Sequence, residues 1–458
     1  QLNQEDRKCM VPKRLQVQET IRRSQQIDGI ISQTISKKPQ FKELLTEKLD
    51  KVLVHPVLGY LVFGIILLTI FQSVFFIAEY PMNWIDAAFA WLSETSRTWL
   101  PEGPLNSLIS DGIIPGIGGI VIFAPQIGIL LYFLYLLEDS GYMARVIFLM
   151  DRFLRPFGLN GKSIVPLVSG TACAIPAIMS TRNIENVKER LITILITPFM
   201  TCSARLPVYS IIIALIFTDG TFFGVKYKAI ALLGMYFLGF ATSLIVAFIL
   251  KYFIKNKGKT FLVMDLPTYK MPLWKYDFKL VLGKVWEFIT GAGKIILAVS
   301  VILWFLSYFG PKDDFHILEH HSDVKLENSY LAKIGKQMEP VISPLGYDWK
   351  MGVGILTSFA AREVFVGTMS TLYSLDDDAP EKSVIEKMRS DVKPNGEKVF
   401  SFATGLSILI FYAFAMQCIS TIAVVYRETK SWKWTAIQLV FMSGLAYLAS
   451  MLVYQFFK

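Results

Sequence analysis

Charged residues are scarce in this chain of 458 residues. They make up 18% of it, against about 25% in an average soluble protein, whereas 53% of the chain is hydrophobic and 14% aromatic. This composition excludes a disordered protein and a collagen-like fibre. Together with a mean hydropathy of +0.46, it favours a polytopic membrane protein.

Cysteine and histidine are also rare, with four residues of each. Cys173, Cys202 and Cys418 lie in apolar segments far apart in the sequence, and no spacing resembles a zinc site or a redox pair. This excludes a disulfide-rich secreted module, and we interpret these three cysteines and Cys9 as free thiols. Three of the four histidines lie in one acidic loop, where we expect them to be solvated.

Two further signals are missing. No basic segment with a short apolar core and a cleavage site starts the chain, so we expect no signal peptide, and the start at Gln1 indicates part of a longer protein. The segment before Gly161-Lys-Ser163 lacks the first glycine of a phosphate-binding loop, because Pro156 stands there. No nucleophile–base constellation is recognisable, so no catalytic motif is expected.

Apolar runs of membrane-spanning length dominate the rest of the sequence. Eight clear spans are predicted, at residues 57–78, 113–137, 191–217, 228–253, 285–309, 352–373, 400–426 and 435–457. A ninth apolar segment, 163–181, is broken by Pro166, Gly170 and Pro176 and is expected to be interrupted or re-entrant.

The loops between these runs indicate an orientation. Residues 79–111 are acidic and contain three tryptophans, which suits an interfacial amphipathic helix outside the cell. Residues 138–190 and 251–284 are rich in Arg and Lys and are placed inside. The net charge of +9 therefore reflects cytoplasmic loops rather than binding of nucleic acid.

Two stretches of the chain resemble each other. Cys173 precedes Arg182 by nine residues and Cys418 precedes Arg427 by nine, and a lysine follows each arginine after six more. Glu138 lies ahead of the first stretch and Glu363 ahead of the second. Weak internal similarity of this kind is typical of transporters built from two repeats, whose sites lie between interrupted helices.

The side chains of these segments predict the type of ligand. A carboxylate inside a membrane is costly and rarely without function, which makes Glu363 and Glu138 candidates. The broken segments also carry cysteines and methionines, and a mixed set of thiol, thioether and carboxylate suits Fe(II), Mn(II), Co(II) or Zn(II) better than Mg(II) or Ca(II). The candidate metal residues are Glu138, Met143, Cys173, Met179, Met200, Cys202, Glu363 and Cys418.

Several long motifs make the chain resemble a known family. They are Glu138-Asp-Ser-Gly-Tyr-Met-Ala-Arg145, Met150-Asp-Arg152, Gly158-Leu-Asn-Gly-Lys-Ser163, Pro176-Ala-Ile-Met-Ser-Thr-Arg182, Pro198-Phe-Met-Thr-Cys-Ser-Ala-Arg-Leu-Pro-Val-Tyr209, Pro344-Leu-Gly346, Phe359-Ala-Ala-Arg-Glu-Val364 and Gln417-Cys-Ile-Ser-Thr421. In this order, from about Leu44 to the C-terminus, they resemble the membrane domain of ferrous iron transport protein B. One departure is Gly170-Thr-Ala-Cys-Ala-Ile-Pro176, where many members have Gly-Cys-Asn-Val-Pro.

The resemblance implies a fold and a set of partners. It implies an all-α polytopic protein with about eight transmembrane helices, further broken or re-entrant segments, and two Gate repeats at about 113–217 and 345–457. Residues 1–50 resemble the tail of a cytoplasmic connector to a GTP-binding domain, in the same or a separate chain, and residues 51–458 resemble the transport domain. GTP and Mg would enter only through that absent domain. Membrane lipid, small cytoplasmic accessory proteins and a second copy of the chain are the other partners implied, and no permanently bound cofactor is expected.

The function expected is import of Fe(II) across the prokaryotic inner membrane. Glu138, Cys173, Glu363 and Cys418 would line the path, with help from Cys202 and nearby methionines. The alternatives are another divalent metal, a nucleoside carried by Gate-type repeats, or a non-transporting scaffold for a separate GTPase. The prevalence of Cys, Met and Glu in the broken segments favours a metal.

Overall fold

The structure is a computed structural model that describes residues 12–34, 41–101, 103–217, 221–222, 225–254, 267–310, 329–359, 362, 364–373, 387–392, 398–416 and 418–458. The chain forms two compact units, Gln1–Val52 and Leu53–Lys458. The first unit holds α2 (Pro12–Thr34) and all but the last residue of α3 (Phe41–Leu53). The interpretation of residues 1–50 as a cytoplasmic connector stays a prediction.

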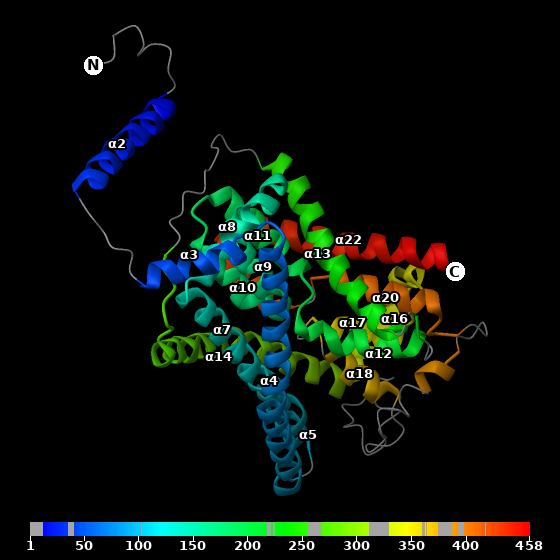
Figure 1. Cartoon of the computed structure of the whole chain (residues 1–458). Coiled ribbons are helices and arrows are strands. Elements are labelled where there is room, and N and C mark those ends of the chain that lie inside the picture. Colours follow the sequence, from blue (N-terminus) through cyan, green and yellow to red (C-terminus); the bar gives the residue numbers. More distant parts are fainter. Residues whose placement is uncertain are drawn as a thin grey trace. The chain divides into compact units, whose positions relative to one another are not determined.

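The second unit is helical almost throughout its described residues (Figure 1). Its first half comprises α4 (Leu58–Trp99), α5 (Pro104–Ser107), η1 (Leu108–Ile113), α6 (Ile114–Val121), α7 (Ala124–Asp139), α8 (Tyr142–Leu154), η2 (Arg155–Phe157), η3 (Gly161–Ser163), α9 (Ile164–Ala172), α10 (Ala174–Ser180), η4 (Thr181–Asn183), α11 (Val187–Ile196), η5 (Thr197–Phe199), η6 (Ser203–Arg205), α12 (Leu206–Ile216), the two-residue strands β1 (Thr221–Phe222) and β2 (Val225–Lys226), and α13 (Tyr227–Phe253). Its second half comprises α14 (Trp274–Tyr308), α16 (Tyr330–Ile342), η7 (Ser343–Leu345), α17 (Trp349–Thr357), α18 (Val364–Tyr373), α20 (Phe402–Phe414), α21 (Ile419–Thr429) and α22 (Trp432–Phe457).

Six stretches in the described residues are long and apolar enough to cross a membrane. They are Leu58–Trp99, Pro104–Asp139, Val187–Ile216, Tyr227–Phe253, Phe402–Thr429 and Trp432–Phe457, and a shorter apolar helical segment runs over Ile296–Tyr308. The multi-pass helical fold is therefore confirmed, whereas the count of eight spans is not. The predicted span 352–373 is two short helices, α17 and α18, separated by residues 358–363.

The segment 79–111 also differs from its prediction. It is not a separate interfacial helix, because α4 continues through Pro81 to Trp99. A helix of 42 residues measures about 63 Å, roughly twice the thickness of the hydrocarbon core of a bilayer. Trp84 and Trp91 are strongly exposed on this extension.

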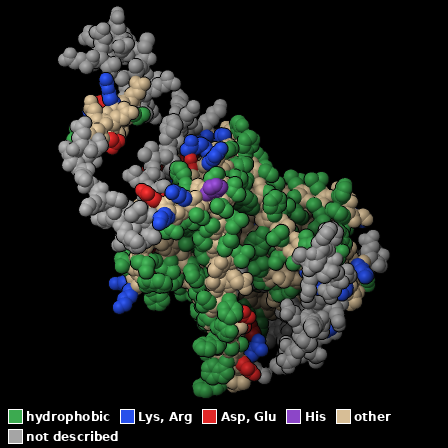
Figure 2. All heavy atoms as spheres, in the orientation of Figure 1, with side chains coloured by type: hydrophobic (Ala, Val, Ile, Leu, Met, Phe, Trp, Pro, Cys, Tyr) green, Lys and Arg blue, Asp and Glu red, His purple; other side chains and the backbone are tan. Residues whose placement is uncertain are grey.

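Exposed apolar side chains cover the long helices of the second unit. Leu68 on α4, Phe237 on α13 and Val440 on α22 are each about 70% exposed, and Figure 2 shows hydrophobic side chains over much of the visible face. Surfaces of this size and apolarity suit contact with lipid rather than water.

Four helical segments are interrupted in the middle. The interruptions lie at Cys173 between α9 and α10, at residues 197–205 between α11 and α12, at the described residues 358, 359 and 362 between α17 and α18, and at the described residues 415, 416 and 418 between α20 and α21. In the first half, Pro176 and Pro207 lie in the first turn of the helix after each break. Proline is tolerated there, because the backbone N–H that it lacks would have no acceptor within the helix.

The same order of elements occurs twice in the second unit. When η3–η6 and the two short strands are left out, the run α7–α8–η2–α9–α10–α11–α12–α13 corresponds in order to the described elements α14–α16–η7–α17–α18–α20–α21–α22, and α8 and α16 are both 13 residues long. Gly158 and Gly346 follow η2 and η7 with φ of 79° and 87°. This order places Cys202 opposite Cys418 and places Cys173 opposite the break at 358–363, a different pairing from the one that the Cys–Arg–Lys spacing suggested.

Candidate metal pathway

Three cysteines lie at helix breaks with extended backbones. Cys173 has φ and ψ of −152° and 130°, Cys418 has −154° and 105°, and Cys202 has −86° and 162°. Each stands immediately before a helix, and none of the three forms a disulfide. Extended residues within a helical span free backbone groups from the helix ladder, which is how interrupted helices build ion sites in transporters.

The breaks of each half are bonded to one another. The hydroxyl of Ser203 donates to the carbonyl of Ala172 at 2.9 Å, which joins the Cys202 and Cys173 breaks. The backbone N–H of Ile419 donates to the carbonyl of Phe359 at 3.1 Å, which joins the two breaks of the second half. The irregular segments therefore support each other through their own polar groups, as irregular backbone at membrane depth must.

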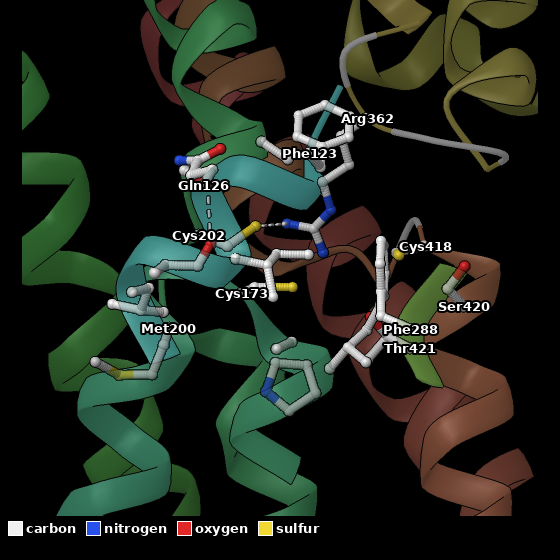
Figure 3. Close-up of a pocket in the computed structure, with 18 of the residues that line it drawn as sticks. Phe123, Gln126, Cys173, Met200, Cys202, Phe288, Arg362, Cys418, Ser420 and Thr421 are labelled. Atoms are coloured by element: carbon white, nitrogen blue, oxygen red, sulfur yellow. Dashed lines mark hydrogen bonds between the residues drawn. The ribbon is translucent and has the colours of Figure 1, made fainter. Parts of the chain in front are cut away.

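A cavity of about 100 Å³ lies where these breaks meet (Figure 3). Its volume is enough for several water molecules. Phe288 of α14 and Gln126 of α7 contribute to its wall. The sulfur-bearing residues that line it are Cys173, Met200, Cys202 and Cys418.

Two polar groups of the second half also face this cavity. Ser420 is 1% exposed, and its hydroxyl has no hydrogen-bond partner among the described residues. Arg362 is 6% exposed, and Figure 3 shows its guanidinium pointing between Cys202 and Cys418. Its Nη1 donates to the Sγ of Cys202 at 3.8 Å, and its Nη2 donates to the carbonyl of Ala415 at 3.3 Å.

A second buried arginine beside the cavity has a different environment. Arg205 is fully buried, and its guanidinium donates to the carbonyls of Pro198, Phe199 and Met200 at 3.0–3.2 Å. These carbonyls belong to the break between α11 and α12. Arg205 therefore stabilises the irregular backbone that carries Cys202.

Two further cavities, each of about 300 Å³, follow the first: one adjoins the thiol-lined cavity, and the other adjoins that second cavity through Glu138, Val165, Ser180 and Asn183. One shares Ile127, Ile175 and Phe288 with the thiol-lined cavity and is also lined by Glu138 and Met179. The other is lined by Glu138 and Met143. Glu138 thus faces both of these cavities but not the thiol-lined one.

Charged side chains join the two halves beyond these cavities. Glu428 at the end of α21 has a side chain only 3% exposed and accepts from the Nε of Arg182 and the Nη2 of Arg190, both at 3.0 Å. The bond to Glu428 raises the pKa of Arg182. Within the second half, Arg427 donates to Glu287 of α14 at 2.6 Å. These contacts connect α21 to η4, α11 and α14.

The structure thus divides the predicted metal residues into two sets. Cys173, Met200, Cys202 and Cys418 line one cavity, and Glu138, Met143 and Met179 line the adjoining ones. Glu363 lies outside the described residues. Within the part of the chain that is described, no group of three or more His, Cys, Asp or Glu side chains is arranged to hold one metal ion.

Two features of this region were missed from the sequence. Arg362 is not among the predicted site residues, although an arginine within the predicted apolar span 352–373 was an available signal. The second feature is the sequence correspondence of Met200-Thr-Cys202 with Met416-Gln-Cys418, two stretches that lie in the equivalent breaks after α11 and α20. A search for short motifs at equivalent helix ends would have found this pair.

Interrupted spans around a thiol-lined cavity define a multi-pass membrane protein that is helical almost throughout its described residues. A family model described as Gate, nucleoside recognition, matches residues 120–216 and 289–432, which is more than half of the chain. The chain therefore belongs to the Gate family. Between these segments, residues 232–287 match the family described as ferrous iron transport protein B C terminus.

The chain is also similar over nearly its whole length to curated proteins named Fe(2+) transporter FeoB. The chain is 44% identical over 443 residues to the Fe(2+) transporter FeoB of Leptospira biflexa, covering 96% of this chain and 64% of the relative. It is 36% identical over 441 residues to that of Staphylococcus aureus strain MSSA476, covering 94% and 62%. It is 34% identical over 458 residues to an Fe(2+) transport protein A/Fe(2+) transporter FeoB fusion protein of Porphyromonas gingivalis, covering 94% and 53%.

These matches confirm the resemblance to the membrane domain of ferrous iron transport protein B. The chain spans 64% or less of the length of the three relatives described above. No solved structure matches the chain.

Proposed function

We propose that this chain is the membrane domain of a ferrous iron importer and that Fe(II) passes through the thiol-lined cavity. The observation that carries the proposal is the meeting of Cys173, Cys202 and Cys418 from three separate helix breaks around one small cavity. Three thiols far apart in sequence have no structural need to meet, whereas thiols are suitable ligands for Fe(II). The names of the relatives, Fe(2+) transporter FeoB, support the choice of cargo.

The arrangement suits a transient ligand set. The thiols, the Met200 thioether and the Ser420 hydroxyl can replace part of the hydration shell of the ion, and water in the cavity supplies the rest. An open set of this kind lets an ion leave again, as transport requires. Glu138 in the adjoining cavities provides the next carboxylate along the path, and Glu363 remains a predicted ligand.

Two structural repeats would allow access to the cavity to alternate between the two sides of the membrane. We place them at residues 124–253 and 274–457, where the order of elements recurs, in place of 113–217 and 345–457. Cys202 and Cys418 are then equivalent residues, each two positions after a methionine. Rearrangement of one repeat against the other would expose the cavity to each side of the membrane in turn.

The relatives also suggest what acts with this chain. Their additional length would hold the GTP-binding domain that the resemblance implies, in the same polypeptide or as a partner. The fusion in Porphyromonas gingivalis supports a small accessory protein as a second partner. We propose the cytoplasmic membrane as the location.

A nucleoside is the second candidate cargo, because the Gate family model is described as nucleoside recognition. Pockets for small organic molecules usually measure about 300–1,000 Å³. The thiol-lined cavity measures about 100 Å³ and is lined by sulfur and apolar groups, which favours a partly hydrated ion.

The proposal is tested by metal flux into liposomes that contain the purified chain and a dye quenched by Fe(II). Under reducing conditions, we expect Fe(II)-dependent quenching that Cys173→Ser, Cys202→Ser and Cys418→Ser each reduce about tenfold or more, whereas Cys9→Ser, outside every predicted span, leaves it unchanged. Mn(II) and Zn(II) added as competitors measure selectivity. Flux that is equal in all four variants would contradict the site. If no flux occurs, the assay is repeated with the GTP-binding domain of a relative, and continued absence of flux would contradict the cargo.

A further inference from the structure

The position of Arg362 in the thiol-lined cavity is difficult to explain as packing alone. The residue belongs to the break between α17 and α18, in the second half of the unit, yet its guanidinium contacts the sulfur of Cys202 in the first half. A guanidinium keeps its proton in proteins, so this is a permanent positive charge in a cavity proposed to bind a cation.

The charge is also poorly compensated. In the described part of the chain, no carboxylate lies within ion-pair distance of Arg362, and its buried Nε has no hydrogen-bond partner. The Nε of Arg205 also lacks a partner among the described residues, but the guanidinium of Arg205 donates to three backbone carbonyls, whereas that of Arg362 donates to one carbonyl and one sulfur. Burial of a charge without full pairing is unfavourable, so the position of Arg362 is one that it can leave at little cost.

We propose that Arg362 is a tethered cation that occupies the thiol-lined cavity in the metal-free protein and must withdraw from Cys202 before a metal ion binds there. This inference rests on the proposed function, because it assumes that the cavity binds a metal cation. A guanidinium and a divalent cation repel each other strongly at the short distance that one sulfur imposes on both. The two therefore occupy the sulfur in turn.

Binding of a metal ion in the cavity would therefore be coupled to movement of Arg362 away from Cys202. Arg362 cannot lose its charge, so the repulsion is relieved only when Arg362 moves away from the break that carries Cys202. An entering metal ion would then separate the two halves at this contact. After the ion leaves, the guanidinium returns to the sulfur and keeps other cations out of the empty cavity.

The first test measures the charge at Cys202 without any metal. Two thiol reagents of similar size are compared on the purified chain, the anionic sulfonatoethyl and the cationic trimethylammonioethyl methanethiosulfonate, and modification of Cys202 is quantified by peptide mass spectrometry. In the wild type the anionic reagent should react faster. Arg362→Gln should lower the ratio of the two rates about tenfold, whereas Arg362→Lys keeps it.

A matched control is available on the surface of the same half. Arg389 is exposed and donates to the carbonyl of Ala214 at 2.8 Å, so Arg389→Gln removes the same charge away from the cavity and should leave the ratio unchanged. Size-exclusion chromatography identifies variants that do not fold. If Arg362→Gln is among them, Arg362→Met is used in its place. If both neutral variants fail to fold, Arg362 is a structural residue and the proposal is overturned.

The second test uses Co(II) as the probe, with all cysteines present, and measures the concentration that protects Cys202 from the reagents. We expect protection of Arg362→Gln at a concentration about tenfold lower than for the wild type, and an unchanged concentration for Arg362→Lys. Protection that is equal in Arg362→Gln and the wild type, or a rate ratio that does not change, would overturn the role of Arg362 alone. Failure of Co(II) and of Fe(II) to protect any variant would overturn the proposed metal site and this inference with it.

Discussion

Gly158 and Gly346 end the same structural unit in the two halves of the protein. Each adopts a left-handed backbone after a 13-residue helix and one short helical turn. The bonds match as well, since Gly158 N–H donates to Arg155 and Gly346 N–H to Ser343, at 3.0 and 2.9 Å. The caps that follow are equivalent, because Asn160 begins η3 and Asp348 begins α17 with side-chain bonds to backbone N–H groups.

Replacement of these two glycines by alanine should lower the free energy of unfolding for two reasons. Both positions have a left-handed backbone, and Gly346 in addition packs against Tyr454. Gly158→Ala is expected to destabilise the fold by about 1–2 kcal/mol, the cost of a left-handed conformation for a residue with Cβ, and its Cβ would also lie 2.8 Å from the side chain of Lys251, which must shift. Gly346→Ala should cost about 1–3 kcal/mol more, because its Cβ would lie 2.2 Å from the ring of Tyr454 on α22. Thermal unfolding in detergent measures both. Gly444→Ala, which meets nothing within 4 Å, is the control and should not destabilise. Equal losses for Gly158→Ala and Gly346→Ala would contradict the packing on Tyr454.

Asp348 should make stability depend on pH. Burial raises the pKa of its carboxyl, although the side chain also accepts from the N–H of Met351 at 2.9 Å. A raised pKa in the folded state gives stability that is present at low pH and lost as the pH rises through that pKa. Asp348→Asn keeps the cap, as Asn160 does in the first half, and should be at least as stable as the wild type at about pH 8, with the difference vanishing at about pH 4.

Unfolding midpoints at several pH values test this prediction. Asp348→Ala is the comparison, because it removes both the charge and the cap and should cost about 1 kcal/mol relative to Asp348→Asn. A pH dependence that is identical in Asp348→Asn and the wild type would show that another group carries it.

Glu428 should matter far more than an exposed carboxylate with the same kind of partner. Glu428→Gln removes the charge that Arg182 and Arg190 share, and its side chain is 3% exposed, so a loss of about 1–3 kcal/mol is expected. The matched control is Glu185→Gln. The side chain of Glu185 pairs with Lys162 but is 87% exposed, so this substitution should hardly change the unfolding midpoint. Both are compared by unfolding midpoint at low and high salt. Equal effects of the two substitutions would mean that the contact between the halves is not stabilising.

The two equivalent methionines should differ in function. Met200 lines the thiol-lined cavity, whereas Met416 is fully buried in the core and does not line it. Leucine has a similar volume, so neither Met200→Leu nor Met416→Leu should lose more than about 1.5 kcal/mol of stability. In the liposome assay, Met200→Leu should slow Fe(II) flux and Met416→Leu should not. A slower flux in Met416→Leu alone would place the path on the other side of the cysteines.

Most of the helical architecture could be predicted from apolar runs and prolines in the sequence. Spanning length and charge distribution follow from local composition, which is why a multi-pass helical protein could be predicted. Pro176 and Pro207 also marked helix starts after the breaks of the first half. Nothing of that kind marks residues 414–418, Phe-Ala-Met-Gln-Cys, which have good helical propensity and were assigned to a continuous span.

The pairing of the repeats shows a second limit. Spacing alone matched Cys173 with Cys418, because Arg and Lys follow each at the same intervals. The recurrence of α8–η2 in α16–η7 fixes another register, in which Cys202 is the counterpart of Cys418. Sequence similarity between the halves is too weak to choose between these registers, whereas backbone conformation is repeated closely enough to do so.

By itself the sequence determined that this chain is a helical membrane protein, where most of its spans lie, and which side chains are candidates to bind a soft divalent metal. Only the tertiary structure decided which of these side chains share a cavity. The breaks in the second half form because long-range bonds replace those of the helix, as when Ile419 N–H donates to Phe359 and Arg362 to Ala415. Such contacts join residues far apart in the chain, and no local pattern encodes them.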